Sequence, residues 1–255
     1  MTHQPDKSGE SRGIALVTGG SGGIGSAIVR RLVADGQKVA FTYRNNAPSE
    51  LLTDLGEQVE AHQLTLSDLV AAEKLIGGLL DHHGSIHTLI HAAGPHVPMV
   101  HLSHVTPDQF AEQVNADLVG FFNIVHATLP ALRSSTGSIV AVTSAATSRY
   151  PKRDGLSAIP KGGVEAMVRA LAVEEGRYGV RANCVGPGML NDGMAARLMA
   201  AGDLDERSLA ITSSNIPLGR FGTSHDIAEA VAFLASDRAD FISGHKLNVD
   251  GGYSV

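Results

Sequence analysis

Short apolar runs, many of them β-branched, alternate along the chain with longer segments whose apolar residues recur every three or four positions. Runs of the first kind predict β-strands, and segments of the second kind predict amphipathic helices. The expected strands are Ile14–Thr18, Lys38–Tyr43, Val59–Leu64, Ile86–His91, Ser138–Thr143, Val180–Val185 and Lys246–Val249. The expected helices are Gly23–Asp35, Ser49–Gly56, Ser67–His82 (capped by Ser67), Pro107–Arg133, Ser157–Tyr178 and Asp226–Ala235. This alternation predicts an α/β fold, a doubly wound parallel sheet with helices on both faces.

The chain of 255 residues shows no internal repeat and no linker-like stretch. This length is typical of one large α/β domain, so we expect a single domain over residues 13–255. The polar residues 1–12 are expected to form a flexible tail, and the Ala- and Met-rich stretch Asn191–Ser213 a mobile helical insert. Ligands of such sheets bind beyond the carboxyl ends of the strands, so site residues are expected in the loops that follow them.

Composition narrows the class of protein further. The formal net charge is -6 and aromatic residues make up 4%, which argues against a nucleic-acid partner, because such proteins need a basic face and stacking platforms. No apolar run approaches the roughly 20 residues that a membrane span needs. The start of the sequence lacks the apolar core of a signal peptide, and the single cysteine, Cys184, cannot form an internal disulfide. We therefore expect a cytoplasmic protein.

A glycine cluster follows the first expected strand and opens the first expected helix. The run Ile14–Gly25 reads IALVTGGSGGIG. In this position Gly19 permits a tight turn, Ser21 and Gly22 can approach a pyrophosphate, and Gly25 lets the helix pack on the strand. The pattern predicts a dinucleotide site in a Rossmann-like sheet.

Further motifs make the interpretation specific. TGGSGGIG resembles the TGxxxGIG fingerprint of the short-chain dehydrogenase/reductase family. The matching segments that follow in order are HAAG at His91–Gly94, VNADLVG at Val114–Gly120, VTS at Val142–Ser144, Lys161 with GGVEAM, NCVGPG at Asn183–Gly188 and NVDGG at Asn248–Gly252. The pattern as a whole resembles 3-oxoacyl-carrier-protein reductases. It implies an NAD(P)(H)-dependent oxidoreductase acting on a small apolar or thioester substrate, and a homotetramer whose assembly surface lies in Thr223–Gly252.

The resemblance also implies which residues bind the cofactor. They are Gly19, Ser21, Gly22, Ile24, Arg44, Asn45, Thr65, Leu66, Ala92, Ala93, Gly94, Lys161, Pro187, Gly188 and Met189. The second strand ends without a carboxylate, and Arg44 offers a charged fork suited to a 2′-phosphate, so we expect NADP(H) rather than NAD(H). Two positions depart from the pattern. Gly22 stands where many relatives carry a second arginine, and Thr65 where relatives often carry an aspartate near the adenine amine.

The catalytic constellation of the family is present except for one residue. By resemblance, Ser144 is the serine, Lys161 the lysine and Asn115 the asparagine. The tyrosine of the family stands four residues before the lysine, and this chain carries Ser157 there. An alkyl hydroxyl is a far weaker acid than a lysine-assisted phenol, and general acid catalysis contributes about 10²–10⁴ in rate. Ser157 therefore cannot simply replace the tyrosine, and a helix cap with Pro160 in the first turn is its other interpretation.

Three interpretations remain open at this stage. In the first, which we favour, hydride adds to an activated C=C and makes an enolate that needs no strong acid. Ser157–Met167 resembles 2,4-dienoyl-coenzyme A reductases, which also carry serine here, although Ala146 stands where those enzymes place a tyrosine. In the second, a ketone is reduced with Tyr150 or His96 as the substitute proton donor. In the third, the chain binds cofactor without catalysis.

Two further features invite a ligand. Histidines gather in the first half of the chain, at His82, His83, His87, His91, His96, His101 and His104. A metal site needs convergent ligands, and these residues fall on different expected elements, so we expect none. Methionines in and beside the insert, Met189, Met194 and Met199, are candidates for an apolar, adaptable pocket or for simple packing.

Overall fold

The computed structural model describes residues 13–95, 97–192 and 213–255. The expected flexible tail, His96, Met194, Met199 and most of the expected insert lie outside the described residues. Within them, no helix is both long enough and apolar enough to cross a membrane.

The centre of the molecule is a seven-stranded sheet in which every pairing is parallel. Its strands are β1 Ile14–Thr18, β2 Val39–Tyr43, β3 Val59–Gln63, β4 Ile86–His91, β5 Ser138–Val142, β6 Arg181–Pro187 and β7 Lys246–Val249. The order is β3-β2-β1-β4-β5-β6-β7, so the winding reverses between β1 and β4. The doubly wound α/β prediction is confirmed, and the reversal places the binding crevice beyond the carboxyl ends of β1 and β4.

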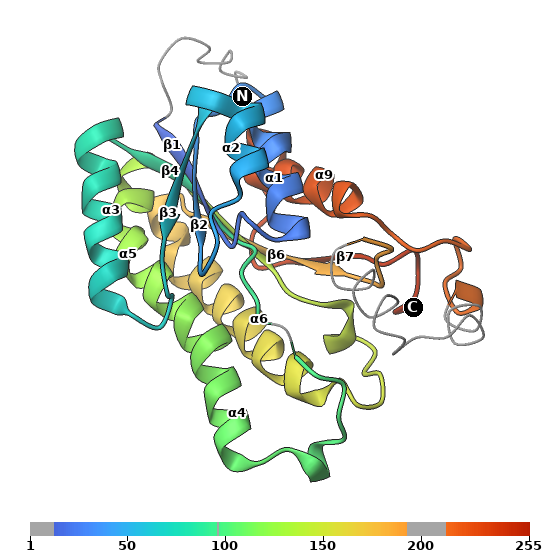
Figure 1. Cartoon of the computed structure of the whole chain (residues 1–255). Coiled ribbons are helices and arrows are strands. Elements are labelled where there is room, and N and C mark those ends of the chain that lie inside the picture. The colour runs from blue at the N-terminus through green and yellow to red at the C-terminus, as the bar shows by residue number, and fades with distance from the viewer. Residues whose placement is uncertain (1–12, 96, 193–212) are drawn as a thin grey trace.

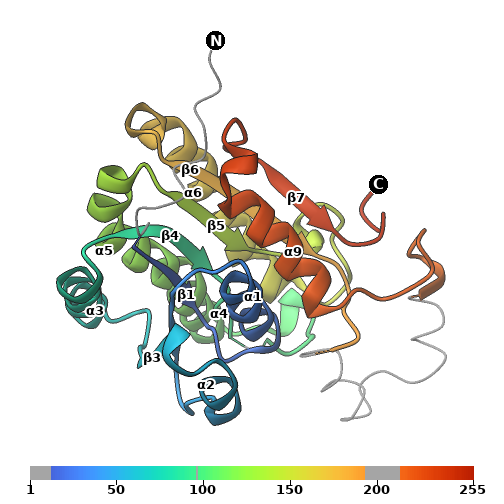
Figure 2. The ribbon, with the colours of Figure 1, turned by 90° about the horizontal axis from the view of Figure 1, so that it is seen from above.

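Helices cover both faces of the sheet (Figures 1 and 2). One face carries α3 Leu69–His83, α4 Pro107–Val114, α5 Gly120–Ser135 and α6 Gly155–Glu175, and the other carries α1 Gly23–Ala34, α2 Ser49–Leu55 and α9 Ser224–Ala235. Adjacent strand residues supply the two cores, because successive side chains of a strand point to opposite faces. Leu16 packs with Phe121 on the first face, and the next residue, Val17, packs with Ile28 on the second.

Three helix starts differ from the prediction, and one of them is that of α9, which begins at Ser224 rather than at Asp226. The cap of α3 is Asp68, whose Oδ1 accepts from the Ala71 amide at 3.0 Å, so the expected cap at Ser67 is wrong. A carboxylate at Asp68 meets the amides of the first turn, and Ser67 lies one residue further out.

The third difference concerns α6, which begins at Gly155 with Asp154 in the cap position. The Ser157 amide already donates to the Asp154 carbonyl oxygen at 3.1 Å, so the cap interpretation of Ser157 is wrong. Pro160 consequently lies in the second turn rather than the first.

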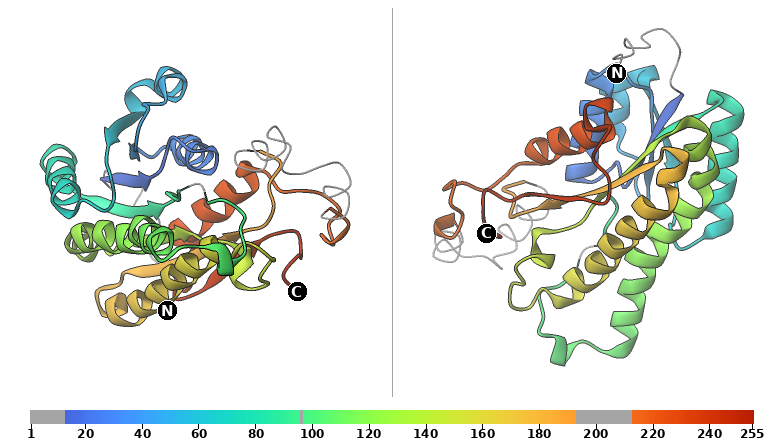
Figure 3. Two further views of the ribbon diagram at one scale, coloured as in Figure 1. Left: turned by 60° about the horizontal axis from the view of Figure 1, so that its bottom comes forward. Right: turned by 180° about the vertical axis from the view of Figure 1, so that it is seen from behind.

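The expected helix over Pro107–Arg133 is one continuous helical path with a π-helical segment, Asn115–Val119, between α4 and α5. Such single π turns widen a helix locally and occur often at functional sites. This helical path lies beside α6 on the same face of the sheet (Figure 3). The widened turn therefore faces the helix that carries Lys161.

Candidate active site

The glycine turn joins β1 to α1 at the point where the sheet reverses. Gly19 has φ +72°, and a Cβ there would lie 2.6 Å from the Ala93 Cα. A Cβ on Gly25 would lie 2.1 Å from the Gly19 carbonyl oxygen. The loops after β1 and β4 therefore touch through backbone at Gly19, where a larger residue would push them apart, and a larger residue at Gly25 would push α1 away from the turn that precedes it.

The amino end of α1 is left uncapped by side chains. Its cap residue is Gly22, which has no side chain that could accept from the first-turn amides. Ser21, Gly22 and Gly23 are exposed. The Gly20 amide is already used, since it donates to the Thr42 carbonyl oxygen at 2.9 Å. Exposed first-turn amides at a helix amino end, next to a glycine cradle, fit the pyrophosphate of a dinucleotide.

The ends of β2 and β3 form the neighbouring rim. Arg44 and Asn45 are exposed, and within the described residues no side chain pairs with the Arg44 guanidinium. Gln63 Nε2 donates to the Arg44 carbonyl oxygen at 2.9 Å and so holds the backbone of this rim. Thr65 is exposed on the next loop, and Asn123 Nδ2 fixes that loop by donating to the Leu66 carbonyl oxygen at 3.0 Å.

Lys161 is buried beside the carboxyl ends of β4 and β5. Its Nζ donates to Asp117 Oδ1 at 2.9 Å and to the carbonyl oxygens of Ala93 at 3.3 Å and Val142 at 3.5 Å. The two side chains are 11% and 1% exposed. A lysine ammonium has three protons, and the contact to Val142 is long for a hydrogen bond, so one proton remains available to a ligand while Asp117 compensates the charge.

The partner of Lys161 is therefore Asp117, which the sequence analysis did not select. Asn115, selected by resemblance, is exposed at the start of the π-helical segment and makes no side-chain hydrogen bond to the lysine. The missed signal was periodicity. Gln113, Asp117 and Phe121 are spaced by four residues and are all buried, so a carboxylate stands in the middle of a core-facing stripe. A buried carboxylate needs a partner, and only a cation supplies one of matching charge.

Ser144 follows β5 and caps the short 3-10 helix Ala145–Thr147. Its Oγ accepts from the Ala146 amide at 3.1 Å, which leaves the hydroxyl proton available to a ligand. Its carbonyl oxygen accepts from Lys246 Nζ at 2.8 Å. Lys246 also forms an ion pair with Glu165 at 2.9 Å, so a buried pair from β7 and α6, absent from the sequence predictions, holds the Ser144 loop.

Ser157 and Tyr150 occupy the other side of the candidate site. Ser157 is half-buried and stands one helical turn before Lys161, so the two share a face of α6. Tyr150 is 60% exposed, and its hydroxyl lies 3.9 Å from where a Cβ on Gly162 would be. The structure thus brings Tyr150 to α6 but gives it no hydrogen bond to Ser144 or Lys161.

Two ionisable groups near this site have altered acidities. Burial, followed by the positive charge of Lys161, lowers the pKa of His91 well below its ordinary value, so this residue is neutral. His91 Nδ1 lies 2.9 Å from Thr18 Oγ1. Burial also raises the pKa of the Asp154 carboxyl, which precedes Ser157 by three residues. The sequence analysis had not selected Asp154.

The loop after β6 lies at the carboxyl end of the sheet, next to the end of β7. Pro187 ends the strand, and the Gly188 amide donates to the Val249 carbonyl oxygen at 3.0 Å. A Cβ on Gly188 would lie 2.7 Å from the Asp250 Cα, so the loop and the end of β7 pack without a side chain between them. Met189 is half-buried beside them. Pro187, Gly188 and Met189 thus form the start of the loop at the carboxyl end of β6.

A doubly wound sheet with a glycine turn at its switch point defines the Rossmann-like class of α/β proteins. The family model described as "Enoyl-(Acyl carrier protein) reductase" matches residues 19–254. The chain belongs to the short-chain dehydrogenase/reductase family and is an NAD(P)-dependent oxidoreductase of that family.

Curated relatives within the family differ in their reactions. The chain is 33% identical to L-fucose dehydrogenase of Mus musculus over 94% of this chain and 87% of the relative. It is 33% identical to the 3-oxoacyl-[acyl-carrier-protein] reductase MabA of Mycobacterium tuberculosis, over 94% and 92%. It is 30% identical to the peroxisomal 2,4-dienoyl-CoA reductase SPS19 of Saccharomyces cerevisiae, over 94% and 83%.

Solved structures agree on the fold. A short-chain type dehydrogenase/reductase from Mycobacterium ulcerans superposes with a TM-score of 0.88 at 24% identity, covering 94% of this chain and 89% of that one. The crystal structure of gox2181 gives a TM-score of 0.86 at 27% identity, covering 94% and 95%. The Rossmann-like architecture is therefore shared over nearly the whole chain.

Proposed function

We propose that this protein is an NADP(H)-dependent reductase that adds hydride to an activated C=C of a small apolar substrate, such as an enoyl thioester. The observation that carries the proposal is the face of α6 around Lys161. One turn before the lysine stands Ser157 rather than a phenol, and the lysine charge is compensated by Asp117. The site thus lacks the phenol that ketone reduction in this family uses as its acid.

Reduction of a conjugated C=C makes smaller demands on the protein. NADPH, when bound, would supply the hydride that adds to the carbon β to the carbonyl group. The electron pair of the double bond then moves toward the carbonyl oxygen, and the enolate takes its proton at the α-carbon from water. Ser144 can donate its free hydroxyl proton as a hydrogen bond to that oxygen, where negative charge develops. No strong acid is used at any stage.

The proposed cofactor contacts use groups that are exposed at the crevice. Ser21 and Gly22, in the exposed turn before α1, and Ile24, in its first turn, would contact the pyrophosphate, and Lys161 would bind the nicotinamide ribose. Gly19 keeps the cradle open. Arg44 is exposed, its guanidinium has no partner among the described residues, and it would bind the 2′-phosphate of NADP(H). Asn45, Thr65, Leu66, Ala92, Ala93, Gly94, Pro187, Gly188 and Met189 complete the proposed contacts.

Turnover of two matched substrates tests this function. An enoyl thioester and a 3-oxoacyl thioester of the same chain length would be incubated with NADPH and the full chain, and each product identified by mass. We expect the saturated thioester from the first and little 3-hydroxyacyl thioester from the second. The reverse preference would support the ketone reductase, and NADPH binding with neither product would support the silent cofactor-binding protein.

The ketone reductase keeps one observation in its favour. L-fucose dehydrogenase and 3-oxoacyl reductase are names of carbonyl/alcohol enzymes, and the chain is 33% identical to each. Its proton donor would be Tyr150, His96 or Asp154, whose carboxyl pKa is raised by burial. In that case replacing the true donor would cost about 10²–10⁴ in rate.

Assembly and location complete the proposal. We propose a homotetramer that associates through the Thr223–Gly252 region, because Phe241 is fully exposed there and β7 is an edge strand. Exposed apolar surface next to an unpaired strand edge favours association between copies. We also propose a cytoplasmic location, which suits the single thiol of Cys184.

A further inference from the structure

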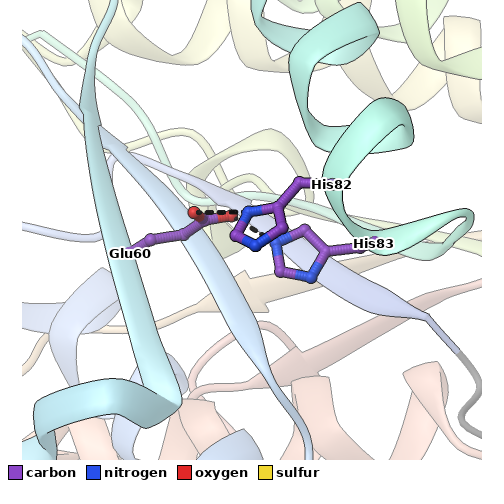
Figure 4. Close-up of side chains that lie close together, drawn as sticks. All are labelled: Glu60, His82 and His83. Atoms are coloured by element: carbon purple, nitrogen blue, oxygen red, sulfur yellow. Dashed lines mark hydrogen bonds and ion pairs between the residues drawn. The ribbon is translucent and has the colours of Figure 1, made fainter.

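We infer that Glu60, His82 and His83 form a binding site for one divalent transition-metal ion of the zinc type, between β3 and the end of α3. One ligand atom from each residue lies within 4.8 Å of the others. His83 Nε2 is 2.8 Å from Glu60 Oε1, and His82 Nδ1 is 4.0 Å from Glu60 Oε2. Figure 4 shows both imidazoles turned toward the carboxylate across the space between strand and helix.

A fourth side chain points to the same carboxylate. His62 stands two residues after Glu60 on β3, so both side chains leave the same face of the strand. Its Nε2 lies 3.7 Å from Glu60 Oε2 and is buried without a hydrogen-bond partner among the described residues. Buried polar atoms are nearly always paired, so an orphan imidazole nitrogen beside a carboxylate indicates a missing ligand.

The donor set selects the kind of ion. Imidazole nitrogen with one carboxylate oxygen suits zinc, nickel and copper, whereas calcium and magnesium prefer oxygen alone. A tetrahedral zinc ion about 2.1 Å from each donor holds the donors roughly 3.4 Å apart. The 2.8 Å separation of His83 and Glu60 would have to widen and the 4.0 Å separation of His82 and Glu60 to close, and the His82 side chain, which is 74% exposed, has room to move.

The position of the site defines its role. Glu60 lies near the amino end of β3, and the histidines lie in the last turn of α3. The ion would therefore bind at the amino ends of the strands, whereas the cofactor crevice lies at their carboxyl ends (Figure 1). β3 is an edge strand with no fully buried residue, and β2 is its one neighbour in the sheet. An ion bound by both β3 and α3 would link the edge strand to the helix. Because it binds only the folded chain, it would raise the free energy of unfolding by mass action.

The test is a Zn²⁺ titration of the full chain without an affinity tag, followed by competition with a chromogenic chelator and by thermal unfolding. We expect one equivalent to bind and raise the unfolding temperature. His82→Gln should weaken binding at least about tenfold, the effect of losing about 1.4 kcal/mol of ligand binding. His225→Gln is the matched control, because His225 is 76% exposed and lies 3.7 Å from Glu229 on α9.

Several results would overturn the site. The first is an unfolding temperature that does not change with Zn²⁺. The second is an equal loss of Zn²⁺ affinity in His82→Gln and His225→Gln, and the third is an unchanged Zn²⁺ affinity in Glu60→Gln. Since His82 is a surface residue, its variant should fold, and circular dichroism would check this. The readout contains neither NADPH nor substrate, so its failure is separate from a failure of the proposed reductase function. Co²⁺ substitution gives an independent signal, because tetrahedral nitrogen and oxygen ligation produces visible absorption bands that His83→Gln should remove.

Discussion

Lys161 Nζ donates to Asp117 Oδ1 at 2.9 Å, and both side chains are buried between α6 and the π-helical segment. Breaking such a pair strands an uncompensated buried charge, which typically costs about 3–5 kcal/mol of stability. We expect Asp117→Ala to approach that loss, measured as the free energy of unfolding in urea. The double variant Asp117→Ala with Lys161→Met should recover part of it. Losses that simply add would show that the two charges do not interact.

Arg44 should determine cofactor choice. Replacing it with Ala removes a charge-assisted hydrogen bond to the 2′-phosphate, worth about 1.5–3 kcal/mol, or roughly 10- to 150-fold in affinity. Isothermal titration should therefore show weaker NADPH binding and nearly unchanged NADH binding. Arg30→Ala is the control, since that surface arginine already pairs with Asp54 at 2.6 Å. Equal losses for both cofactors would contradict the 2′-phosphate assignment.

Restoring the phenol tests why the site carries serine. Because Ser157 shares a face of α6 with Lys161, Ser157→Tyr should place a hydroxyl beside the lysine and create ketone reduction. A working general acid adds about 10²–10⁴ in rate. Reduction of the enoyl substrate should not improve. Ser157→Phe is the matched control, as it has the same ring without the acid, and a gain shared by both variants would rule out an acid effect.

His91 should make stability depend on pH. Its pKa is lowered in the folded chain by burial and by Lys161, so the folded state stays neutral while the unfolded state takes up a proton below about pH 6.5. The unfolded state then binds more protons, and the stability contributed by neutral His91 is lost as the pH falls below 6.5. The slope of this contribution is at most about 1.4 kcal/mol per pH unit.

Unfolding in urea at pH 7.5 and 5.5 measures this difference. His91→Asn should reduce the loss between the two pH values relative to the parent chain. His126→Asn, which changes an exposed histidine on α5, should leave it unchanged. An identical pH dependence in His91→Asn and the parent would contradict the assignment.

The fold could be predicted because its signals are local. The bounds of β1, β4 and β7 agree with the apolar runs. The glycine cluster between β1 and α1 marks the end of the strand, the turn and the start of the helix. Helix starts were less secure, because Asp68 and Asp154 compete with nearby serines for the cap position. Only the three-dimensional path of the chain decides such cases.

The candidate site shows a different limit. Motif spacing identified Ser144 and Lys161 but not Asp117, whose only sequence signal is its place in a buried stripe spaced by four residues, and that spacing does not show which cation it meets. The interaction of Glu60 with His82 and His83 depends on how α3 returns beside β3. The sequence places these residues on separate elements, so their convergence was not expected.

The most direct test of the proposed reaction follows the transferred hydrogen. A stoichiometric amount of the full chain would be mixed with an enoyl thioester and NADPH carrying deuterium at the transferable position, and the product examined by NMR. We expect a saturated acyl thioester with deuterium on the carbon β to the carbonyl group and a solvent-derived proton on the α-carbon. An intact enoyl substrate, alongside deuterium on the carbinol carbon when a 3-oxoacyl thioester is supplied, would contradict the proposed reaction.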